Sequence, residues 1–321
     1  MSTPTILEIR DLKSSFSVRR SGRKYRVNAV DGVSFSLNQG EVLGLVGESG
    51  CGKTTVGRSI IRLLEPDSGS VNFKGSAVLT AGGAALRALR MNIRMVFQDP
   101  YASLNPRRSI GDSVAEAGDI NRLFRGRAER ASSIAATLTA VGLDPSFATR
   151  YPHELSGGQR QRVGIARSIL PAPDVIIADE PVSALDVSVQ AQVLNLLMDL
   201  REQLGLSIIF ISHDLAVVGQ ISDRISVMYM GRIVESAAVR TILDDPRHPY
   251  TRALISAVPK PDPSRRITGA IETGEPPSQF NRPTGCAYAG RCSMAVGRCF
   301  VEVPRLRPLG QEDRLAACHL L

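Results

Sequence analysis

Tryptophan is absent from this 321-residue sequence, and aromatic residues make up only 5% of it. So few aromatic side chains argue against a lectin or another protein that binds its ligand on an aromatic platform. Long apolar runs are missing too, so no stretch is predicted to span a membrane. The first residues, MSTPTILEIRDLK, include acidic side chains and lack the apolar core of a secretory signal. We therefore expect the protein to stay in the cytosol.

Cysteine is also scarce. The sequence has five, and the last four are separated by five, six and eighteen residues. Disulfides are disfavoured in the cytosol. Most zinc sites use closely spaced cysteine pairs, which are absent, although His319 could complete a set of three cysteines and one histidine. Four thiolates at looser spacing can also hold a [4Fe–4S] cluster. From the residues alone, both metals stay open for Cys286, Cys292, Cys299 and Cys318, whereas Cys51 is expected to be a small filler.

The net charge is +8, and arginine outnumbers lysine. Such a balance suits nucleic acid, an anionic membrane surface or ligands that carry phosphate. The arginines are scattered along the chain, however, which favours a solvated surface. One local cluster, residues 19–26, is expected to form an exposed hairpin tip that could touch a phosphate or a lipid headgroup.

The pattern of apolar residues predicts an α/β protein. Alternating residues predict half-buried strands, continuous apolar runs predict buried strands, and helical spacing predicts long helices. The predicted half-buried strands are 6–12 and 29–37; the buried strands are 41–47, 174–181 and 206–214; residues 103–151 are mainly helical, and 222–236 form a hairpin with Gly231 in its turn. After about residue 244 the chain becomes rich in proline. We expect a main domain over 1–244, with a helical part at about 100–170, and a C-terminal extension over 245–321.

The sequence GESGCGKTT fits the phosphate-loop pattern G-x-x-x-x-G-K-[ST] and lies between a predicted strand and a predicted helix. Glycines let backbone N–H groups surround phosphates, and the helix N-terminus adds its positive dipole end. Lys53 is expected to reach the β- and γ-phosphates, and the Thr54 hydroxyl to bind Mg²⁺. The predicted nucleotide-binding residues are Gly47, Glu48, Ser49, Gly50, Cys51, Gly52, Lys53, Thr54 and Thr55. A chance glycine-rich turn would not have both flanking elements.

A phosphate loop needs a carboxylate on the metal side, and the sequence DVIIADEP provides one. Asp179 follows four apolar residues at the end of a predicted strand, where open parallel sheets bind their ligands. We expect Asp179 to hold Mg²⁺ through water and Glu180 to polarise an attacking water. The alternative is that this acidic pair only caps a helix.

Further motifs resemble those of the ABC-type ATPases. LSGGQRQR resembles their signature sequence, MVFQDP places Gln98 at their Q-loop, SALD with Asp186 resembles their D-loop, and FISHD places His213 at their switch histidine. The resemblance implies a P-loop NTPase with a RecA-like core, an antiparallel β subdomain and a helical signature subdomain. It also implies that Gln98 contacts Mg²⁺, and that ATP is sandwiched in a head-to-tail dimer by Ser156, Gly157, Gly158 and Gln159 of the other subunit. An ordinary N-capped helix is the alternative for the signature. Phe16 lies where the family stacks its adenine, and Tyr25 is a second candidate.

The interval between phosphate loop and signature is short, and only one cassette is present. These features favour a transporter subunit over the ABC proteins of DNA repair or translation. QDPYASLNP, RYPHELSGGQRQR, DPRHPYT and GEPPS resemble the ATPases of oligopeptide/dipeptide importers, most of all the second of their two paired subunits. Related members import nickel, glutathione or oligosaccharides, so the cargo stays open.

The importer resemblance implies an assembly on the cytoplasmic face of the membrane. Its partners would be two transmembrane permease subunits, a second ATPase subunit (this chain or a paralogue) and an external solute-binding protein, with no nucleic acid. The family also carries a cysteine quartet with an iron–sulfur cluster in its C-terminal extension. The resemblance therefore favours a [4Fe–4S] cluster over zinc, as a structural staple of an extension too small for a core of its own.

Overall fold

The computed structural model describes residues 3–20, 22–258, 280, 282–310 and 313–321. Its contacts divide into two compact units, neither of which is a continuous stretch of chain. The first comprises Met1–Ile6, Leu37–Glu41 and Thr80–Ile211, and the second comprises Leu7–Ser36, Val42–Leu79 and Ser212–Leu321. The GEPPS sequence, residues 274–278, lies outside the described residues.

The first unit contains a parallel sheet in the order β8 (Ser207–Ser212), β7 (Val175–Asp179) and β6 (Ile93–Val96). Ile177 of β7 pairs with Met95 on one side and with Ile209 on the other. Every residue of β7 and β8 is buried, as the continuous apolar runs predicted. β7 therefore carries the acidic residues that follow it to the carboxyl end of a parallel sheet.

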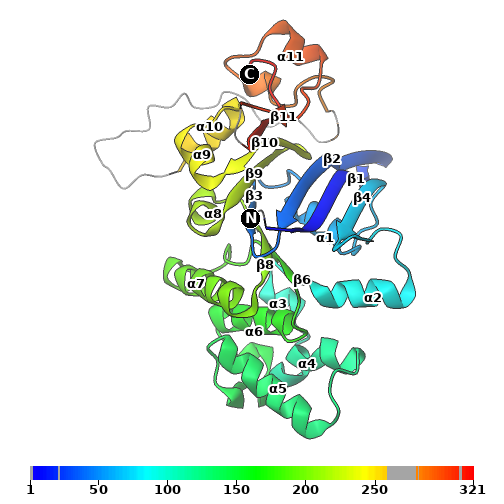
Figure 1. The fold of residues 1–321 in the computed structure, drawn as a ribbon, viewed down its shortest axis with the longest axis vertical. Coiled ribbons are helices and arrows are strands. Elements are labelled where there is room, and N and C mark those ends of the chain that lie inside the picture. Colours follow the sequence, from blue (N-terminus) through cyan, green and yellow to red (C-terminus); the bar gives the residue numbers. More distant parts are fainter. Residues whose placement is uncertain (1–2, 21, 259–279, 281, 311–312) are drawn as a thin grey trace. The chain divides into compact units, whose positions relative to one another are not determined.

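Helices make up most of the rest of the first unit, and α4, α5 and α6 pack together (Figure 1). Arg130 of α5 joins this group through ion pairs to Asp112 and Asp119 of α4, each at 2.8 Å. The prediction of a helical region at 103–151 is confirmed. The elements are α2 (Gly83–Asn92), α3 (Pro100–Ser103), α4 (Ile110–Ile120), α5 (Arg127–Ala140), the 3₁₀ turns Pro145–Thr149 and Pro152–Glu154, α6 (Gly157–Ile169) and α7 (Val187–Leu204).

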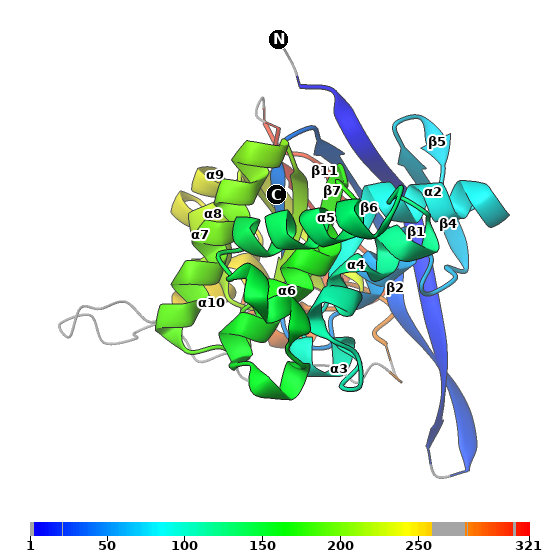
Figure 2. The ribbon, with the colours of Figure 1, turned by 90° about the horizontal axis from the view of Figure 1, so that it is seen from below.

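The second unit contains an antiparallel sheet in the order β2 (Arg23–Asn38), β1 (Thr5–Arg20), β4 (Ser68–Phe73) and β5 (Ser76–Ala77). β1 and β2 are much longer than the predicted strands 6–12 and 29–37, and Figure 2 shows them as one long ribbon pair. The described residues of the basic cluster end β1 at Arg20 and begin β2 at Arg23, as the predicted hairpin requires, and Gly22 has a φ of 75°. The shift in register between Arg10 and Lys13 marks a bulge at Asp11, whose φ is 47°.

A second sheet of this unit runs in the order β11 (Arg307–Pro308), β12 (Leu315–Ala316), β10 (Arg232–Ala238), β9 (Arg224–Tyr229) and β3 (Val42–Val46). β9 and β10 form the predicted hairpin. Its two loop residues, Met230 and Gly231, have φ values of 45° and 80°, which suit the right-handed twist of paired strands. Because β12 pairs with β10, the end of the C-terminal extension is a strand of this sheet.

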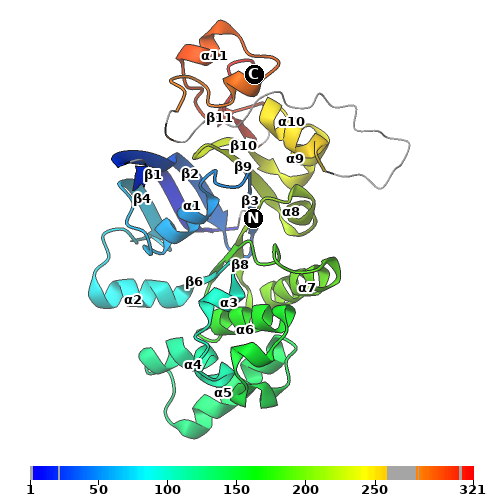
Figure 3. The ribbon, with the colours of Figure 1, turned by 180° about the vertical axis from the view of Figure 1, so that it is seen from behind.

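The helices of the second unit are α1 (Lys53–Ile60), α8 (Leu215–Ile221), α9 (Val239–Asp244), α10 (Pro249–Ser256) and α11 (Gly297–Val301), with a 3₁₀ turn at Ala289–Arg291. Figure 3 shows α9 close to β10, with which it packs. We call residues 282–302, which include the 3₁₀ turn and α11, the cysteine lobe. Within the described ranges, no helix combines the length and apolar character needed to cross a membrane.

Candidate nucleotide-binding site

The phosphate loop connects β3 to α1, and two of its glycines are fixed by close packing. Gly47 has a φ of 156°, and a Cβ atom there would lie 2.1 Å from the carbonyl oxygen of Met228. Gly52 has a φ of 108°, and its Cβ atom would lie 2.1 Å from the carbonyl oxygen of Ala29. Any side chain at either position would collide with backbone, so the loop depends on glycine at both.

Lys53 is buried at the first position of α1, with only 4% of its surface exposed. Its Nζ donates hydrogen bonds to the carbonyl oxygens of Gly47 at 2.7 Å and Glu48 at 3.0 Å. The ammonium group thus closes the loop on itself. Cys51 fills the space beside it, and burial raises the pKa of its thiol.

Two residues that the sequence analysis did not single out contact this loop. The Tyr250 hydroxyl accepts a hydrogen bond from the backbone N–H of Glu48, and Arg291 pairs with the Glu48 carboxylate. Tyr250 lies in the DPRHPYT sequence, which indicated the importer family. Arg291 lies between Cys286 and Cys292, which indicated a metal site. Sequence separations of 202 and 243 residues hide such contacts from any local pattern.

In the first unit, the structure brings Gln98 and Glu180 together. The Gln98 side-chain amide donates a hydrogen bond of 3.0 Å to the Glu180 carboxylate. Glu180 has a φ of 44°, a strained conformation for a residue with a side chain, and its backbone N–H donates to the Ile211 carbonyl oxygen. Asp179, the last residue of β7, is fully buried. The positive φ of Glu180 therefore turns the chain sharply just after Asp179, the end of β7.

The signature residues begin α6 with a reciprocal cap. Ser156 accepts a hydrogen bond from the Gln159 backbone N–H at 3.3 Å, and Gln159 accepts one from the Ser156 N–H at 2.9 Å. This is the N-cap arrangement that was the alternative interpretation of the motif. A Cβ atom on Gly158 would lie 2.5 Å from the Val189 side chain of α7, so the glycine allows the two helices to approach.

Asp186 begins α7 in the same way. Its carboxylate accepts hydrogen bonds from the Ser188 hydroxyl at 2.6 Å and from the Val189 N–H at 3.0 Å. These hydrogen bonds hold the pKa of Asp186 below its usual value, and the bond from Ser188 has the larger effect. The D-loop and signature residues therefore stand at adjacent helix N-termini of the first unit.

The predicted site residues fall in both units. The phosphate loop and His213 belong to the second, and His213 is exposed in the turn between β8 and α8. The predicted residues of the first unit are Gln98, Ser156, Gly157, Gly158, Gln159, Asp179, Glu180 and Asp186.

A cavity of about 210 Å³ lies beside the phosphate loop and is lined in part by Gly50, Cys51 and Phe280. Tyr25 meets the Phe280 ring edge-on at 5.4 Å between ring centroids. Phe16, the other adenine candidate, is half-buried on β1, and neither Phe16 nor Tyr25 itself lines this cavity. Phe280 is an aromatic neighbour that the sequence pattern gave no reason to choose.

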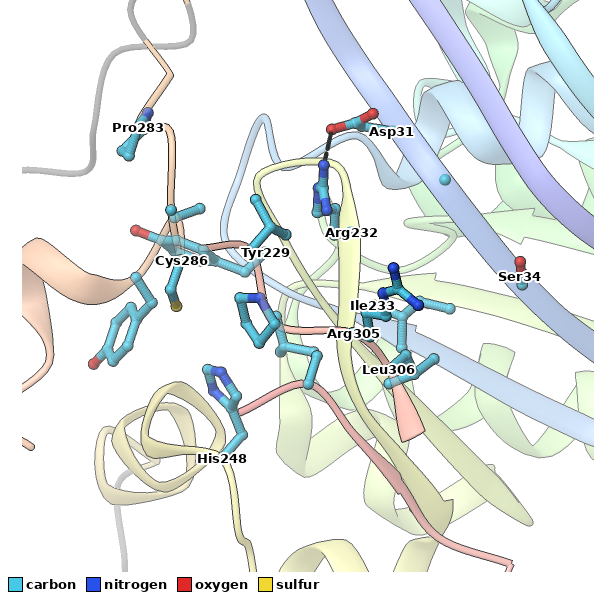
Figure 4. Close-up of a pocket in the computed structure, with 18 of the residues that line it drawn as sticks. Asp31, Ser34, Tyr229, Arg232, Ile233, His248, Pro283, Cys286, Arg305 and Leu306 are labelled. Carbon is cyan, nitrogen blue, oxygen red and sulfur yellow. Dashed lines mark hydrogen bonds and ion pairs between the residues drawn. The ribbon is translucent and has the colours of Figure 1, made fainter. Parts of the chain in front are cut away.

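A larger cavity, of about 800 Å³, lies within the second unit against the cysteine lobe (Figure 4). Cys286, His248 and Tyr229 line it, together with the ion pair of Asp31 and Arg232 at 2.7 Å. Asp31 also pairs with Arg282, at 2.6 Å, where the chain enters the lobe. The Asp31 carboxylate of β2 thus binds both Arg232 of β10 and Arg282 at the entry to the lobe.

Cys286, Cys292, Cys299 and Cys318 are free thiols in the structure. Burial raises the pKa of Cys286 and of Cys292, and the neighbouring thiols raise both further. The Cys286 N–H donates a hydrogen bond of 2.7 Å to the Cys299 carbonyl oxygen. Among the residues that the structure describes, however, no set of three or more His, Cys, Asp or Glu side chains is arranged to hold a metal ion.

Comparison with known proteins matches two families to this chain. The family "ABC transporter" matches residues 30–183, and the family "Oligopeptide/dipeptide transporter, C-terminal region" matches residues 234–299. Among solved structures, a dimeric structure of the ATP-binding cassette MJ0796 in a post-hydrolysis state with ADP and Pi is 27% identical. Its TM-score is 0.65, and the match covers 73% of this chain and 99% of that one.

Several curated proteins are similar over almost the whole chain. The oligopeptide transport ATP-binding protein AppF of Bacillus subtilis is 49% identical over 323 residues, which cover 98% of this chain and 97% of AppF. A putative oligopeptide transport ATP-binding protein of the same organism, YkfD, is 46% identical over 98% of this chain and 95% of its own length. A putative peptide import ATP-binding protein of Brucella ovis is 49% identical over 96% of this chain and 95% of its own length. With the phosphate loop in place and this similarity along its length, the chain belongs to the ABC-type ATPases, as an ATP-binding subunit of the oligopeptide/dipeptide transporter family.

Proposed function

We propose that this protein hydrolyses ATP to ADP and phosphate and thereby powers the import of di- or oligopeptides through a membrane transporter. The similarity to peptide-transport ATP-binding proteins, which extends through the C-terminal region at residues 234–299, carries this proposal. The same similarity supports a place at the cytoplasmic face of the membrane beside two permease subunits, supplied with cargo by an external binding protein.

ATP would bind at the phosphate loop. Its backbone N–H groups and the N-terminus of α1 would contact the phosphates, and Lys53 would shift from the loop carbonyls toward the β- and γ-phosphates. Phe16 and Tyr25 are the two candidates for stacking on adenine, and Tyr25 contacts the ring of Phe280, which lines the cavity beside the loop.

Hydrolysis requires a water aimed at the γ-phosphate. Glu180 would accept a proton from that water, and the hydrogen bond from Gln98 would hold the carboxylate in one orientation. Thr54, Gln98 and Asp179 offer the hydroxyl, amide and carboxylate oxygens that Mg²⁺ prefers, and the ion would neutralise charge on the phosphates. His213 would contact the γ-phosphate from the turn after β8.

The helix N-termini at Ser156 and Asp186 suit a second role, contact with ATP held by another ATPase subunit. MJ0796, to which this chain is similar in fold, is described as a dimer. We propose a head-to-tail dimer with a paralogous subunit or with a second copy, in which this chain is the second of the paired importer subunits.

A single substitution tests the hydrolysis mechanism. The protein would be purified with its co-encoded membrane subunits, and ATPase activity compared for the wild type, Glu180→Gln and the exposed α7 control Glu202→Gln. We expect Glu180→Gln to lose at least about a hundredfold in rate and the control to keep wild-type activity. Undiminished hydrolysis in Glu180→Gln would remove the residue from the mechanism.

Transport needs its own measurement. In vesicles that contain the whole transporter, a binding protein loaded with labelled peptide should raise ATPase activity and deliver label to the lumen. Nickel, glutathione and an oligosaccharide are the competing cargoes of related importers. Uptake of one of these, with no uptake of any peptide, would contradict the proposed cargo while leaving the ATPase role intact.

We propose also that the cysteine quartet holds a metal centre, a [4Fe–4S] cluster in preference to zinc. The chemistry of two of these thiols supports this, because burial and then the charges of neighbouring thiols raise the pKa of Cys286 and of Cys292, and a bound cation would relieve that penalty. Such a centre would staple a lobe with little core of its own.

Metal analysis of anaerobically purified protein tests this assignment. We expect iron and a visible absorption band in the wild type, loss of both in Cys292→Ser, and retention of both in Cys51→Ser, which changes a cysteine of the phosphate loop. Zinc without iron in colourless protein would overturn the choice of metal. Metal-free wild-type protein would overturn the centre itself.

A further inference from the structure

Glu48, the second residue of the phosphate loop, is held on three sides within the second unit. Its carbonyl oxygen accepts a hydrogen bond from Lys53, at 3.0 Å. Its backbone N–H donates to the Tyr250 hydroxyl at 2.9 Å. Its carboxylate accepts hydrogen bonds from one guanidinium nitrogen of Arg291, at 3.0 Å to Oε1 and 3.1 Å to Oε2. Two of these three partners come from the chain beyond residue 244.

Both of these contacts are shielded from water. Tyr250 is fully buried, and the Arg291 side chain is 10% exposed. The Glu48 side chain is 31% exposed, so the ion pair is partly buried rather than a surface pair of negligible strength. Removing Arg291 would leave the Glu48 carboxylate without its partner in this setting, which costs more than the loss of an exposed pair.

An aromatic cluster supports the two contacts. The rings of Tyr229 and Tyr250 are 4.5 Å apart between centroids, and each lies 5.4 Å from the ring of Tyr288. The Arg291 guanidinium lies 5.7 Å from the Tyr288 ring centroid, and one of its nitrogens is 3.4 Å from the Tyr229 hydroxyl. The side chains that contact Glu48 are therefore fixed by the packing of β9, α10 and the cysteine lobe against one another.

From these contacts we propose that Arg291 and Tyr250 are positioning residues for nucleotide binding, and that they act by holding Glu48 and with it the outer turn of the phosphate loop. A phosphate loop binds well only if its N–H groups already point inward, because each freedom left in the loop must be lost on binding. The hydrogen bond from the Glu48 N–H to Tyr250 fixes the peptide plane between Gly47 and Glu48. The bond from Lys53 to the Glu48 carbonyl oxygen fixes the plane between Glu48 and Ser49. The cysteine lobe thus contributes to the ATP site without touching ATP.

The proposal rests on the proposed role of the phosphate loop in binding ATP, and nucleotide affinity is its direct readout. With the full-length chain, a fluorescent ATP analogue and Mg²⁺, we expect Arg291→Ala to weaken binding about tenfold and Tyr250→Phe about threefold. Arg291→Lys should recover much of the loss, because a single nitrogen contacts both carboxylate oxygens. In the assembled transporter, KM for ATP should rise while kcat stays close to the wild-type value.

The matched control is Arg298→Ala. Arg298 belongs to the same lobe and pairs with Glu302 at 2.7 Å, but the two side chains are 61% and 52% exposed. A double-mutant cycle with Glu48→Gln adds a second check, because the effects of Arg291→Ala and Glu48→Gln should overlap rather than add. Thermal unfolding of each variant separates lost affinity from lost folding.

The outcomes are distinct. Affinity in Arg291→Ala and Tyr250→Phe equal to that of Arg298→Ala would overturn the positioning role, as would fully additive effects in the cycle. If Arg291→Ala does not fold, Tyr250→Phe and Glu48→Gln still decide the matter, since neither removes a large side chain. Wild-type protein that binds no nucleotide would overturn the proposed ATPase function itself, before any variant is compared.

Discussion

The loop after β3 and the chain after β7 both leave buried parallel strands and both carry predicted site residues, yet they are held differently. The first turns on glycines that have no room for a Cβ atom and on a buried lysine that bonds to its own loop. The second turns on Glu180, which has a side chain at a positive φ and accepts a hydrogen bond from Gln98 in the chain after β6. A loop that must surround a ligand with backbone N–H groups needs glycines. A turn that must present a carboxylate keeps a residue with a side chain, even where its backbone conformation is strained.

The largest effect is expected where the phosphate loop has no space. In Gly52→Ala the new methyl group would lie 2.1 Å from the Ala29 carbonyl oxygen, at a φ of 108°. We expect a loss of about 4 kcal/mol in the free energy of unfolding, measured by urea denaturation, and no detectable ATP binding. Gly75→Ala is the control, because Gly75 has a φ of 77° and open space around it. A similar loss in both variants would show that backbone strain, rather than the collision, decides the effect.

The support behind the phosphate loop is buried and therefore sensitive to pH. Burial lowers the pKa of His248 to about 4. The nearby Glu235 carboxylate favours the charged form and raises this pKa, but by less than burial lowers it. Between pH 6.5 and pH 4, the histidine of the unfolded chain, with its ordinary pKa of 6.5, is protonated, whereas His248 of the folded chain is not. Stability is therefore full above pH 6.5 and is lost as the pH falls toward 4, by about 3 kcal/mol from this residue.

Urea unfolding between pH 4 and pH 7 measures this loss. His248 Nδ1 accepts the Tyr250 N–H at 3.1 Å, a bond that requires an unprotonated nitrogen, and Asn can accept in its place. His248→Asn should therefore have a shallower slope with pH than the wild type. Equal slopes would place the acid sensitivity on the carboxylates instead.

A smaller effect is expected after β7. Gln98→Ala removes the hydrogen bond to Glu180 but none of the contacts of the phosphate loop. We expect kcat for ATP hydrolysis to fall about tenfold, while the affinity for ATP analogues measured without Mg²⁺ changes little. A large loss of affinity with unchanged kcat would reverse the roles assigned to the two regions.

The smallest effect on stability is expected for the two serines that cap helices of the first unit, and comparing them shows whether Ser156 is only a cap or also binds nucleotide. Ser156 caps α6 and Ser109 caps α4, each through a bond to the backbone N–H three residues on. Replacing either by alanine should cost about 1 kcal/mol in the free energy of unfolding. Only Ser156→Ala should also lower ATPase activity in the assembled transporter. Equal activities would mean that the signature serine acts as a helix cap alone.

Local patterns predicted much of the fold and the candidate site. The hairpin at Gly231, the buried strands before the phosphate loop and before Asp179, and the helical region were all confirmed, because period, turn chemistry and apolar runs lie within short segments. The lengths of β1 and β2 were underestimated, since exposed polar residues continue these strands past the apolar alternation. The roles of the site residues and the domain boundary at residue 244 stay predictions.

The sequence by itself determined that this is an ABC-type ATPase, because a phosphate loop needs glycines, a lysine and a hydroxyl at fixed spacing and the remaining motifs follow in order. Only the tertiary structure decided that Tyr250 and Arg291 reach Glu48, and that Gln98 reaches Glu180. The physical reason is the range of the interactions. The residues of a motif lie within one short segment of the chain, whereas a hydrogen bond across two hundred residues depends on how the strands and helices between them pack.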